Sequence, residues 1–443
     1  MLKIALIGQN IAPLLPSMLT DLLQVSKQRA DLFIEENNSA MQDLLVGYGR
    51  ACLEKAGIGG SIQATARRQE VLSRADLVIY AGDLMASSRF QQDREALSGI
   101  DENDEGLLDQ ARVNGGIGGL MHTLRQGSVI LALGEEMQRE CPGAIVISMG
   151  DPVARTTEMF SRMGFTSYGL ASSVLRGPTG LDGFAEKLGT KLENIDAVTA
   201  GLPDFAFLYS IRDKETQQSL MNEVYSLASD GVFGRLIQRW YRLYEAVAVG
   251  RVTGHAELMP AQEDFIPEEK PDFGESVVHR KDRILHMNKV GEKGLNDPDG
   301  MISQLMLLSR TSPLRPIRLG LALLRHESMI IPEVTRRNSG TIPGLSPSAF
   351  ICAPLHLENG KEIIEPLSFP GPLLDLMGDI AETASLAAQA ALGDRGLLRE
   401  CIEVDPALAG LDRLYLQDVA SAMIRMHSDI LSQFPDEEED DLW

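Results

Sequence analysis

The stretch that most constrains the fold begins with AIVIS, a largely apolar, β-branched run at residues 144–148. Such runs form strands that are buried on both faces of a parallel sheet. Pro152 lacks a backbone N–H and stops the strand, so Asp151 is expected at the strand's carboxyl end. A helix is predicted over 153–164, closed by Gly164. Because open α/β sheets bind ligands outside the carboxyl ends of their strands, Asp151 is a candidate site residue.

The chain opens with a strand, a glycine and a helix. LKIALIG at residues 2–8 predicts a buried strand that ends at Gly8, which is how a dinucleotide-binding βαβ unit begins. Only the first of the three fingerprint glycines is present, because Asn10 and Pro13 stand where the second and third would lie. Asparagine tolerates the left-handed backbone that a tight turn needs. The sequence leaves two interpretations open, a cofactor turn or a plain buried strand and turn.

An acidic residue ends the expected second strand, ADLFIE. Glu35 in this position would accept hydrogen bonds from a ribose 2′-hydroxyl and favour NAD over NADP; a solvated carboxylate is the alternative. A further buried strand over 77–81 ends at Gly82. The residues predicted to bind NAD are Gly8, Gln9, Asn10, Ile11, Glu35 and Gly82.

Two loops are further candidates for ligand contact. Four glycines at 115–119 precede an amphipathic helix, and such a loop lets backbone N–H groups approach an anion or a sugar. It lacks the Lys-Ser/Thr of a P-loop, so it is not a nucleotide triphosphate site; a flexible hinge is the alternative. Arg89, with Asp93 and Arg94, lies just past the strand at 77–81. Arg89 is predicted to contact substrate, with a plain surface charge as the alternative.

The length indicates more than one domain. A chain of 443 residues exceeds one simple core, so two domains are expected in an α/β fold. A Rossmann-like, NAD-binding domain with a parallel sheet is predicted over 1–200. A C-terminal α+β domain over 201–434 is expected to carry substrate and oligomer contacts. The acidic run at 435–443 predicts a disordered tail.

Charge and cysteine content exclude several classes of protein. The net charge of −22 disfavours nonspecific binding to nucleic acid or to an anionic membrane. The four cysteines form no CxxC pair, so neither a zinc knuckle nor a redox dithiol is indicated. The first residues lack a signal-peptide layout, and no apolar run reaches the roughly 18 residues of a membrane span. A cytoplasmic protein is expected.

Six short motifs, spread along the chain in a fixed order, resemble those of glycoside hydrolase family 4, which belongs to the lactate/malate dehydrogenase-like superfamily. The likeness runs along nearly the whole chain, to AALGDRGLLRECIEVDP near its end. The matching segments are residues 8–11 (GQNI for the family's GGGS), 113–119 (VNGGIGG for ETxGxGG), 151–152 (DP for NP), 169–173 (GLASS for GLCHS), 201–207 (GLPDFAF for GLNHxxW) and 338–345 (NSGTIPGL for NxGxIxxLP).

The resemblance implies hydrolysis of an O-glycosidic bond in a sugar, sugar acid or 6-phospho-sugar by an oxidation–elimination–addition route. NAD takes a hydride from C3, a divalent metal, usually Mn²⁺, polarises the C2 and C3 oxygens, and a tyrosine-type base removes the C2 proton. The aglycone leaves, water adds and the hydride returns. The family also forms dimers or tetramers, so a homodimer or homotetramer is expected. Apolar stripes at 301–309 and 381–392 point the same way.

The chain departs from the family at the implied metal site. Ala171 replaces the metal-binding cysteine, Asp204 replaces the histidine ligand, and Asp151 replaces the sugar-binding asparagine. Carboxylates still suit Mn²⁺ or Mg²⁺, so a harder metal site formed by Asp204 with Ser172 or water is one interpretation. Asp151 and Asp204 are predicted to converge, with either a metal between them or a raised pKa on one of them.

Other roles follow from the same resemblance. Tyr241 is the predicted catalytic base, because it lies in the segment that holds the family's tyrosine; Tyr244 is the alternative, and both are compatible with simple packing. Asn338 is a predicted substrate contact. If Asp204 is not a metal ligand, Glu257 and His255 are the next candidates.

Three functions therefore remain in view. The leading one is an NAD- and metal-dependent glycosidase of the family 4 type. The second is a catalytically impaired binding or regulatory protein on the same fold. The third is a dehydrogenase that keeps only the hydride step, which would need a histidine base near Asp204 and finds His255 as its nearest candidate in sequence.

Overall fold

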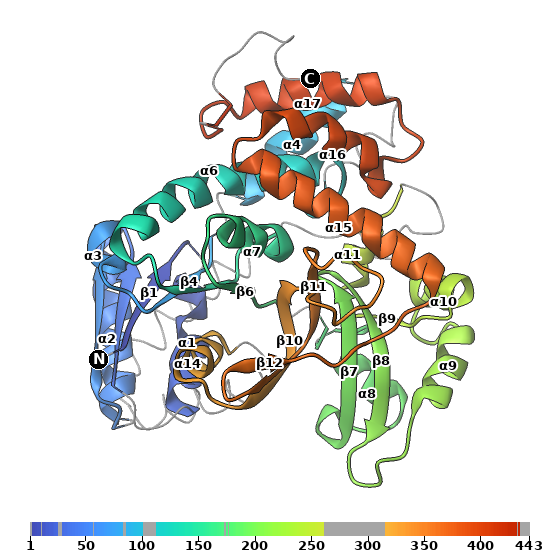
Figure 1. The fold of residues 1–443 in the computed structure, drawn as a ribbon, viewed down its shortest axis with the longest axis horizontal. Helices are drawn as coiled ribbons and strands as arrows, with labels where there is room; N and C mark the ends of the chain where they lie inside the picture. The colour runs from blue at the N-terminus through green and yellow to red at the C-terminus, as the bar shows by residue number, and fades with distance from the viewer. Residues whose placement is uncertain are drawn as a thin grey trace.

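The computed structural model gives the protein an α/β architecture built on one long sheet (Figure 1). The predicted acidic tail lies outside the residues that it describes. Those residues are 2–9, 11–24, 29–55, 57–82, 86–100, 112–171, 174–175, 177–260, 315–431 and 433–434.

The first half of the sheet is parallel. Its strands are β1 (Leu2–Ile7), β2 (Ala30–Glu35), β3 (Gly60–Thr65), β4 (Leu77–Tyr80), β5 (Ile145–Ser148) and β6 (Ser167–Gly169). They lie in the order β3-β2-β1-β4-β5-β6 with every pair parallel. This is the strand order of the Rossmann dinucleotide-binding fold. The predicted Rossmann-like sheet is thus confirmed.

The second half of the sheet is antiparallel. Its strands are β7 (Ile195–Leu202), β8 (Phe205–Asp213), β9 (Ala248–Val249), β10 (Met329–Arg337), β11 (Phe350–Glu358) and β12 (Lys361–Ile363). The order continues from β6 as β10-β11-β7-β8-β9, with β12 paired to β11. Thr335 of β10 pairs with Gly169, and Cys352 of β11 pairs with Gly201 of β7. Two strands from late in the chain therefore join the two halves into one sheet.

Helices cover both faces of the parallel half, because its strands are apolar on both sides. One core lies under three helices, α1 (Ile11–Gln24), α2 (Ser39–Lys55) and α14 (Pro316–Arg325). The opposite core lies under α3 (Arg68–Leu72), α4 (Ala86–Ile100), α6 (Gly116–Glu140) and α7 (Val153–Arg162).

The C-terminal helices extend this second core. They are α15 (Gly371–Ala391), α16 (Leu398–Val404) and α17 (Arg413–Met426), and Figure 1 shows them stacked over α4 and α6. Ala387, Ala388 and Ala391 of α15 are buried there. The apolar stripe at 381–392 is thus largely used within one subunit, and the stripe at 301–309 lies outside the described residues. The oligomer stays a prediction.

A third core lies on the antiparallel half. It is formed with α8 (Leu181–Lys187), α9 (Met221–Ser229), α10 (Arg235–Tyr244) and α11 (Val252–Glu257). The predicted boundary at residue 200 falls inside β7, whose strand partners β8 and β11 both follow that residue in the chain. The two-domain division remains a prediction.

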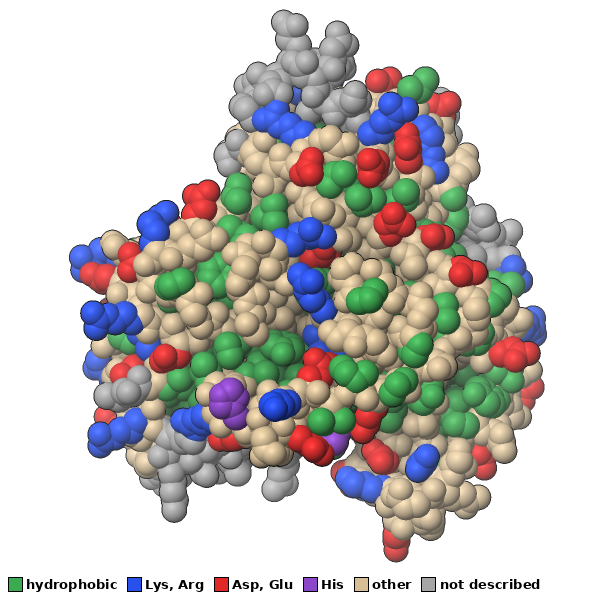
Figure 2. Space-filling view, in the orientation of Figure 1, with side chains coloured by type: hydrophobic (Ala, Val, Ile, Leu, Met, Phe, Trp, Pro, Cys, Tyr) green, Lys and Arg blue, Asp and Glu red, His purple; other side chains and the backbone are tan. Residues whose placement is uncertain are grey.

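The surface charges and the helix lengths relate to what the sequence predicts about nucleic-acid and membrane binding. Figure 2 shows acidic and basic side chains interspersed over the face in view. Every helix in the described part of the chain is too short or too polar to cross a lipid bilayer.

Candidate functional site

Asp151 lies where the sequence predicts it. β5 ends at Ser148, and Asp151 follows as an exposed residue before the buried first turn of α7. Its backbone oxygen accepts a hydrogen bond from Nε2 of His122 on α6 at 3.0 Å. The backbone of Asp151 is therefore held at the carboxyl end of the parallel half.

Asp204 lies at the tip of the β7–β8 hairpin. Leu202 pairs with Phe205, which leaves Pro203 and Asp204 as a two-residue turn. Asp204 has φ +58°, in the left-handed region that aspartate and asparagine tolerate better than most residues. Its side chain is buried. The turn thus fixes the backbone of Asp204 and directs its carboxylate into the protein.

An arginine lies beside one of the two predicted aspartates. Nη2 of Arg251, the residue before α11, lies 3.3 Å from Oδ1 of Asp204, and the arginine side chain is half-exposed. Asp204 first, then Glu257 and Asp151, raise the pKa of Arg251. The convergence of Asp151 and Asp204 stays a prediction, and the described partner of the Asp204 carboxylate is this arginine.

The glycine-rich loop is held by the protein's own carboxylates. Oε2 of Glu257 accepts from the backbone N–H of Asn114 at 2.9 Å and of Val113 at 3.2 Å. Oδ2 of Asp405 accepts from Gly116 N–H at 2.9 Å. Burial raises the pKa of both Glu257 and Asp405. These three N–H groups are already bonded within the protein, so they do not form the ligand cradle that the glycines suggest.

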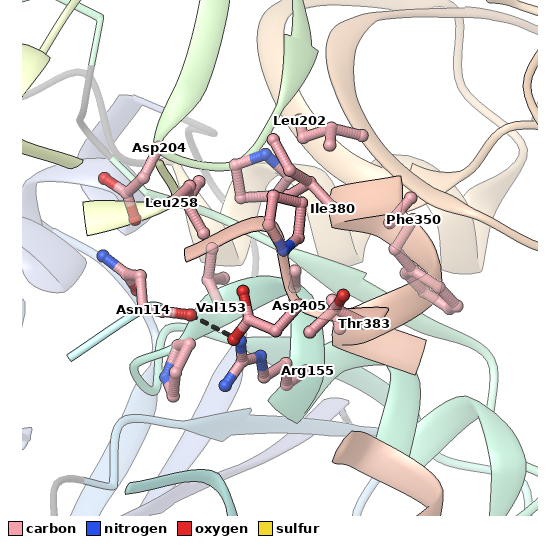
Figure 3. Close-up of a pocket in the computed structure, with 16 residues that line it drawn as sticks. Asn114, Val153, Arg155, Leu202, Asp204, Leu258, Phe350, Ile380, Thr383 and Asp405 are labelled. Atoms are coloured by element: carbon pink, nitrogen blue, oxygen red, sulfur yellow. Dashed lines mark hydrogen bonds between the residues drawn. The ribbon is translucent and has the colours of Figure 1, made fainter. Parts of the chain in front are cut away.

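A pocket of about 510 Å³, including its part open to solvent, lies beside Asp204. Figure 3 shows it between the start of α6, the start of α7, the hairpin tip and α15. Nδ2 of Asn114 is buried and has no hydrogen-bond partner among the described residues. Such an unpaired donor is costly unless a ligand or water accepts from it. The residues that line the pocket include Asn114, Val153, Leu202, Asp204, Leu258 and Thr383.

Arg155 forms the floor of this pocket. It is buried on α7 and donates to the backbone oxygen of Gly119 at 2.7 Å and to Oγ1 of Thr123 at 2.5 Å. It also donates to the Asn114 backbone oxygen, the bond drawn in Figure 3. Arg155 thus holds α6 and α7 together and sets the position of Asn114.

The predicted cofactor residues gather at the carboxyl ends of β1, β2 and β4. Gly8 has φ +118°, and a Cβ there would lie 2.5 Å from the Ala81 backbone, next to Gly82. Ile11 begins α1 and its N–H donates to Gly8 O at 3.2 Å. Gln9 is exposed in the turn, and Asn10 lies outside the described residues. The strand–turn–helix arrangement fits a dinucleotide.

Glu35 is not an isolated carboxylate. Its Oε1 accepts from Nε of Arg68 at 2.9 Å. Burial raises the pKa of Glu35, and Arg68 opposes that shift. The sequence did not predict this pairing. The positive charge of Arg68 offsets the negative charge of Glu35 that would repel a 2′-phosphate.

Three predicted residues make other contacts. Arg89 pairs with Asp429 at 2.6 Å, beyond the end of α17. The Tyr241 ring stacks on Tyr225, with 5.4 Å between ring centroids. The Asn338 amide is buried, accepts from Ile342 N–H at 2.7 Å and donates to backbone oxygens of its own loop. No described contact brings these three to Asp151 or Asp204, and their predicted roles remain predictions.

The described residues do not fit the divalent metal that the resemblance implies. No group of three or more His, Cys, Asp or Glu side chains in the described ranges is arranged to hold a metal ion. Ala171 has no ligand atom in its side chain, and Ser172 lies outside the described residues. His255 is buried against Phe205 and Trp240, and burial lowers its pKa to about 3. It is a neutral core residue.

Sequence reasoning missed four residues of this site: Asn114, Arg155, Arg251 and Asp405. Asp405 carries a detectable signal, because an aspartate before proline is a common helix start. The others are single polar residues with no periodic pattern around them. Their roles depend on segments that meet only in the folded chain.

Comparison with known proteins gives one family. The model of the family 4 glycosyl hydrolases matches residues 3–168. No curated protein matches the chain in sequence.

Solved structures with the same fold cover nearly the whole chain. The putative glucosidase lplD from Bacillus subtilis has a TM-score of 0.73 at 16% identity, covering 95% of this chain and 99% of its own. A 6-phospho-alpha-glucosidase from gut microorganisms, in complex with NAD and Mn²⁺, has 0.72 at 13%, covering 97% and 98%. The 6-phospho-beta glucosidase from Thermotoga maritima, with manganese, NAD⁺ and glucose-6-phosphate, has 0.69 at 16%, covering 96% and 99%. The chain is thus similar to the family 4 glycosyl hydrolases in sequence over residues 3–168, and it shares the fold of these glucosidase structures over nearly its whole length.

Proposed function

We propose that this protein binds NAD and a carbohydrate at the crevice around Asp151, Asp204 and Arg251, and that it hydrolyses an O-glycosidic bond there. The observation that carries the proposal is the buried Nδ2 of Asn114 in the pocket beside Asp204, which has no hydrogen-bond partner in the described part of the chain. A sugar hydroxyl or ring oxygen would accept its hydrogen bond and remove the cost of leaving it unpaired.

The pocket has the mixed character that a sugar ring needs. Val153, Leu202 and Leu258 provide apolar surface, while Asn114 and Thr383 provide polar groups. A sugar presents a C–H face and a rim of hydroxyls, and small-molecule sites combine apolar lining with a few placed polar groups.

NAD is supported by the turn after β1 and by the solved structures of similar fold that contain it. In this chain Gly8, Gln9 and Ile11 would lie along the dinucleotide, and Glu35 would accept from a ribose hydroxyl. When bound, NAD supplies a reversible hydride acceptor for the sugar. Mn²⁺ in two of those structures supports a divalent cation in the chemistry of similar proteins. The described residues of this chain provide no ligand set for it, and the roles of Asp151 and Asn114 do not require it.

Asp151 and Asn114 would orient the sugar. The exposed carboxylate of Asp151 would accept hydrogen bonds from sugar hydroxyls, and Asn114 would donate one from the pocket. Fixing the ring between an acceptor and a donor reduces the entropy cost of reaching the reactive geometry.

A second candidate is a carbohydrate-binding protein without turnover. Two observations favour it: Arg251 engages Asp204, and Tyr241, the predicted base, stacks on Tyr225. The test compares sugar classes, anomers and phosphorylation states with a panel of nitrophenyl glycosides and their 6-phosphates.

The experiment combines calorimetry with NAD⁺ and hydrolysis of the panel, with and without Mn²⁺. Saturable NAD⁺ binding and release of nitrophenol by the wild type support the glycosidase. Asn114→Ala is expected to weaken sugar binding about tenfold while NAD⁺ binding is unchanged. Asn194→Ala, which alters an exposed asparagine, is the matched control and is expected to match the wild type.

The other outcomes separate the alternatives. Sugar binding without hydrolysis supports the binding protein. NADH formation without bond cleavage supports the dehydrogenase. A wild-type protein that binds neither NAD⁺ nor any sugar of the panel refutes the proposed function.

A further inference from the structure

We propose that Arg251 supplies, beside Asp204, the positive charge that a divalent metal would supply, so that the protein binds its ligand without a metal ion. The carbohydrate identity of that ligand rests on the proposed function; the replacement of the metal by Arg251 does not. The argument uses the position of Arg251, the state of the carboxylates around it and its unused donors.

The ion pair is built from two closely packed elements. Asp204 lies at the hairpin tip and Arg251 directly precedes α11. A Cβ added to Gly254 of α11 would lie only 2.9 Å from the Asp204 Cβ. The helix therefore approaches the turn as closely as a glycine permits, and the 3.3 Å contact between Arg251 and Asp204 follows from backbone packing.

The carboxylates near Arg251 are already engaged. Glu257 accepts two backbone N–H groups of the glycine-rich loop, and Asp204 faces the guanidinium. A divalent ion at Asp204 would lie beside a fixed positive charge and would be repelled by it. Ala171 has no side-chain ligand atom. The nearest described thiol, Cys352, donates to Oε1 of Glu333 at 3.5 Å, and burial raises its pKa, so it does not offer the thiolate that a metal would need.

Arg251 retains donors for a ligand. A guanidinium carries five N–H groups, and one nitrogen of Arg251 contacts Asp204. The side chain is 52% exposed, so a ligand can approach its other N–H groups from solvent. They would bind ligand oxygens in the way a metal would, by offering positive charge to lone pairs, but with directional hydrogen bonds.

Titration of Mn²⁺ into the full-length protein by calorimetry, with the metal content of the purified protein measured by mass spectrometry, tests this proposal. The wild type is expected to hold no stoichiometric metal. Arg251→Ala removes the positive charge beside Asp204 and is expected to bind Mn²⁺ at least about tenfold more tightly. Arg251→Lys keeps the charge and is expected to behave as wild type.

Arg399→Ala is the matched control, because Arg399 forms an exposed pair with Glu403 at 2.8 Å; its metal binding should equal the wild type's. A wild type that holds one Mn²⁺ per chain, lost in Asp204→Asn, overturns the proposal. So does an Arg251→Ala protein with native circular dichroism that binds Mn²⁺ no better than wild type. If no sugar binds any of these proteins, the proposed function fails while the metal titrations still decide the role of Arg251.

Discussion

The carboxylate of Asp405 accepts a hydrogen bond from the backbone N–H of Gly116 at 2.9 Å, across 289 residues of sequence. Its second oxygen accepts from Ala407 N–H at 2.8 Å. One buried side chain therefore caps the start of α6 and the turn after α16. Burial lowers the pKa of the Arg155 guanidinium, and the negative charge of Asp405 opposes that shift. The C-terminal region thereby holds the wall of the candidate pocket.

Asp405→Ala should destabilise the protein by about 2 kcal/mol, because two buried N–H groups lose their acceptor. Urea unfolding measures the change. Asp412→Ala is the control: Asp412 caps α17 through Tyr415 N–H at 2.9 Å at an exposed position, where about 1 kcal/mol is expected. An equal loss in both variants would contradict the special role given to Asp405.

Arg68→Ala should change the choice between NAD⁺ and NADP⁺. Without Arg68, the Glu35 carboxylate keeps its full charge and repels a 2′-phosphate, so NADP⁺ affinity should fall about tenfold relative to NAD⁺. Glu35→Gln should shift the ratio the other way. Calorimetry with both cofactors measures it, and Arg67→Ala, which alters an exposed pair with Glu70, should leave the ratio unchanged. No shift in Arg68→Ala would remove the pair from cofactor selection.

Because of Asp21, the free energy of unfolding should decrease as the pH rises. Its Oδ2 accepts from Arg318 N–H at 2.8 Å at the start of α14, and burial raises the pKa of Asp21 to about 7. The native carboxyl holds its proton to higher pH than the unfolded one, so the native state binds more protons between about pH 4 and pH 7. Stability from this group declines across that window, by roughly 4 kcal/mol at most.

The test compares urea unfolding at about pH 5 and about pH 8 for wild type and Asp21→Asn. The asparagine keeps an acceptor for Arg318 N–H but does not titrate, so its loss of stability over this range should be smaller. The same pH dependence in both proteins would show that Asp21 does not cause it.

Arg125→Met should be among the most damaging single changes. Arg125 binds both oxygens of Asp93, at 3.1 and 2.9 Å, and His427 lies 2.6 Å from the same carboxylate, all three buried. Removing the cation leaves a buried carboxylate without its main partner, which costs about 3–5 kcal/mol. Adding Asp93→Asn to Arg125→Met should recover part of that loss. Thermal unfolding compares both with Arg399→Ala, where at most about 1 kcal/mol is expected.

Local sequence rules predicted the framework of the site. The apolar run at 144–148 followed by Pro152 was enough to place Asp151 at a strand end, because strand formation and its termination by proline depend on neighbouring residues. The strand and glycine that open the chain likewise predicted the turn after β1.

The same rules could not predict which residues of the site bond to one another. The glycines at 115–119 suggested free N–H groups, but Asp405 accepts from Gly116 N–H, and Glu257 accepts from Asn114 N–H just before the glycines, both from distant parts of the chain. Arg251 is a single arginine whose role depends on α11 packing against the hairpin tip. Ion pairs between remote segments have no periodic signature in sequence. Which charged residues of the site pair with one another could therefore be learned only from the structure.

The insertion of β10 and β11 between β6 and β7 has a consequence for synthesis. A ribosome delivers β1 through β9 well before it delivers β10, so the growing chain carries two unpaired sheet edges, on β6 and on β7. Open edges invite pairing with other chains. We expect truncated chains that stop before Met329 to aggregate rather than fold, and the middle of the sheet to close last, when most of the protein has already left the ribosome.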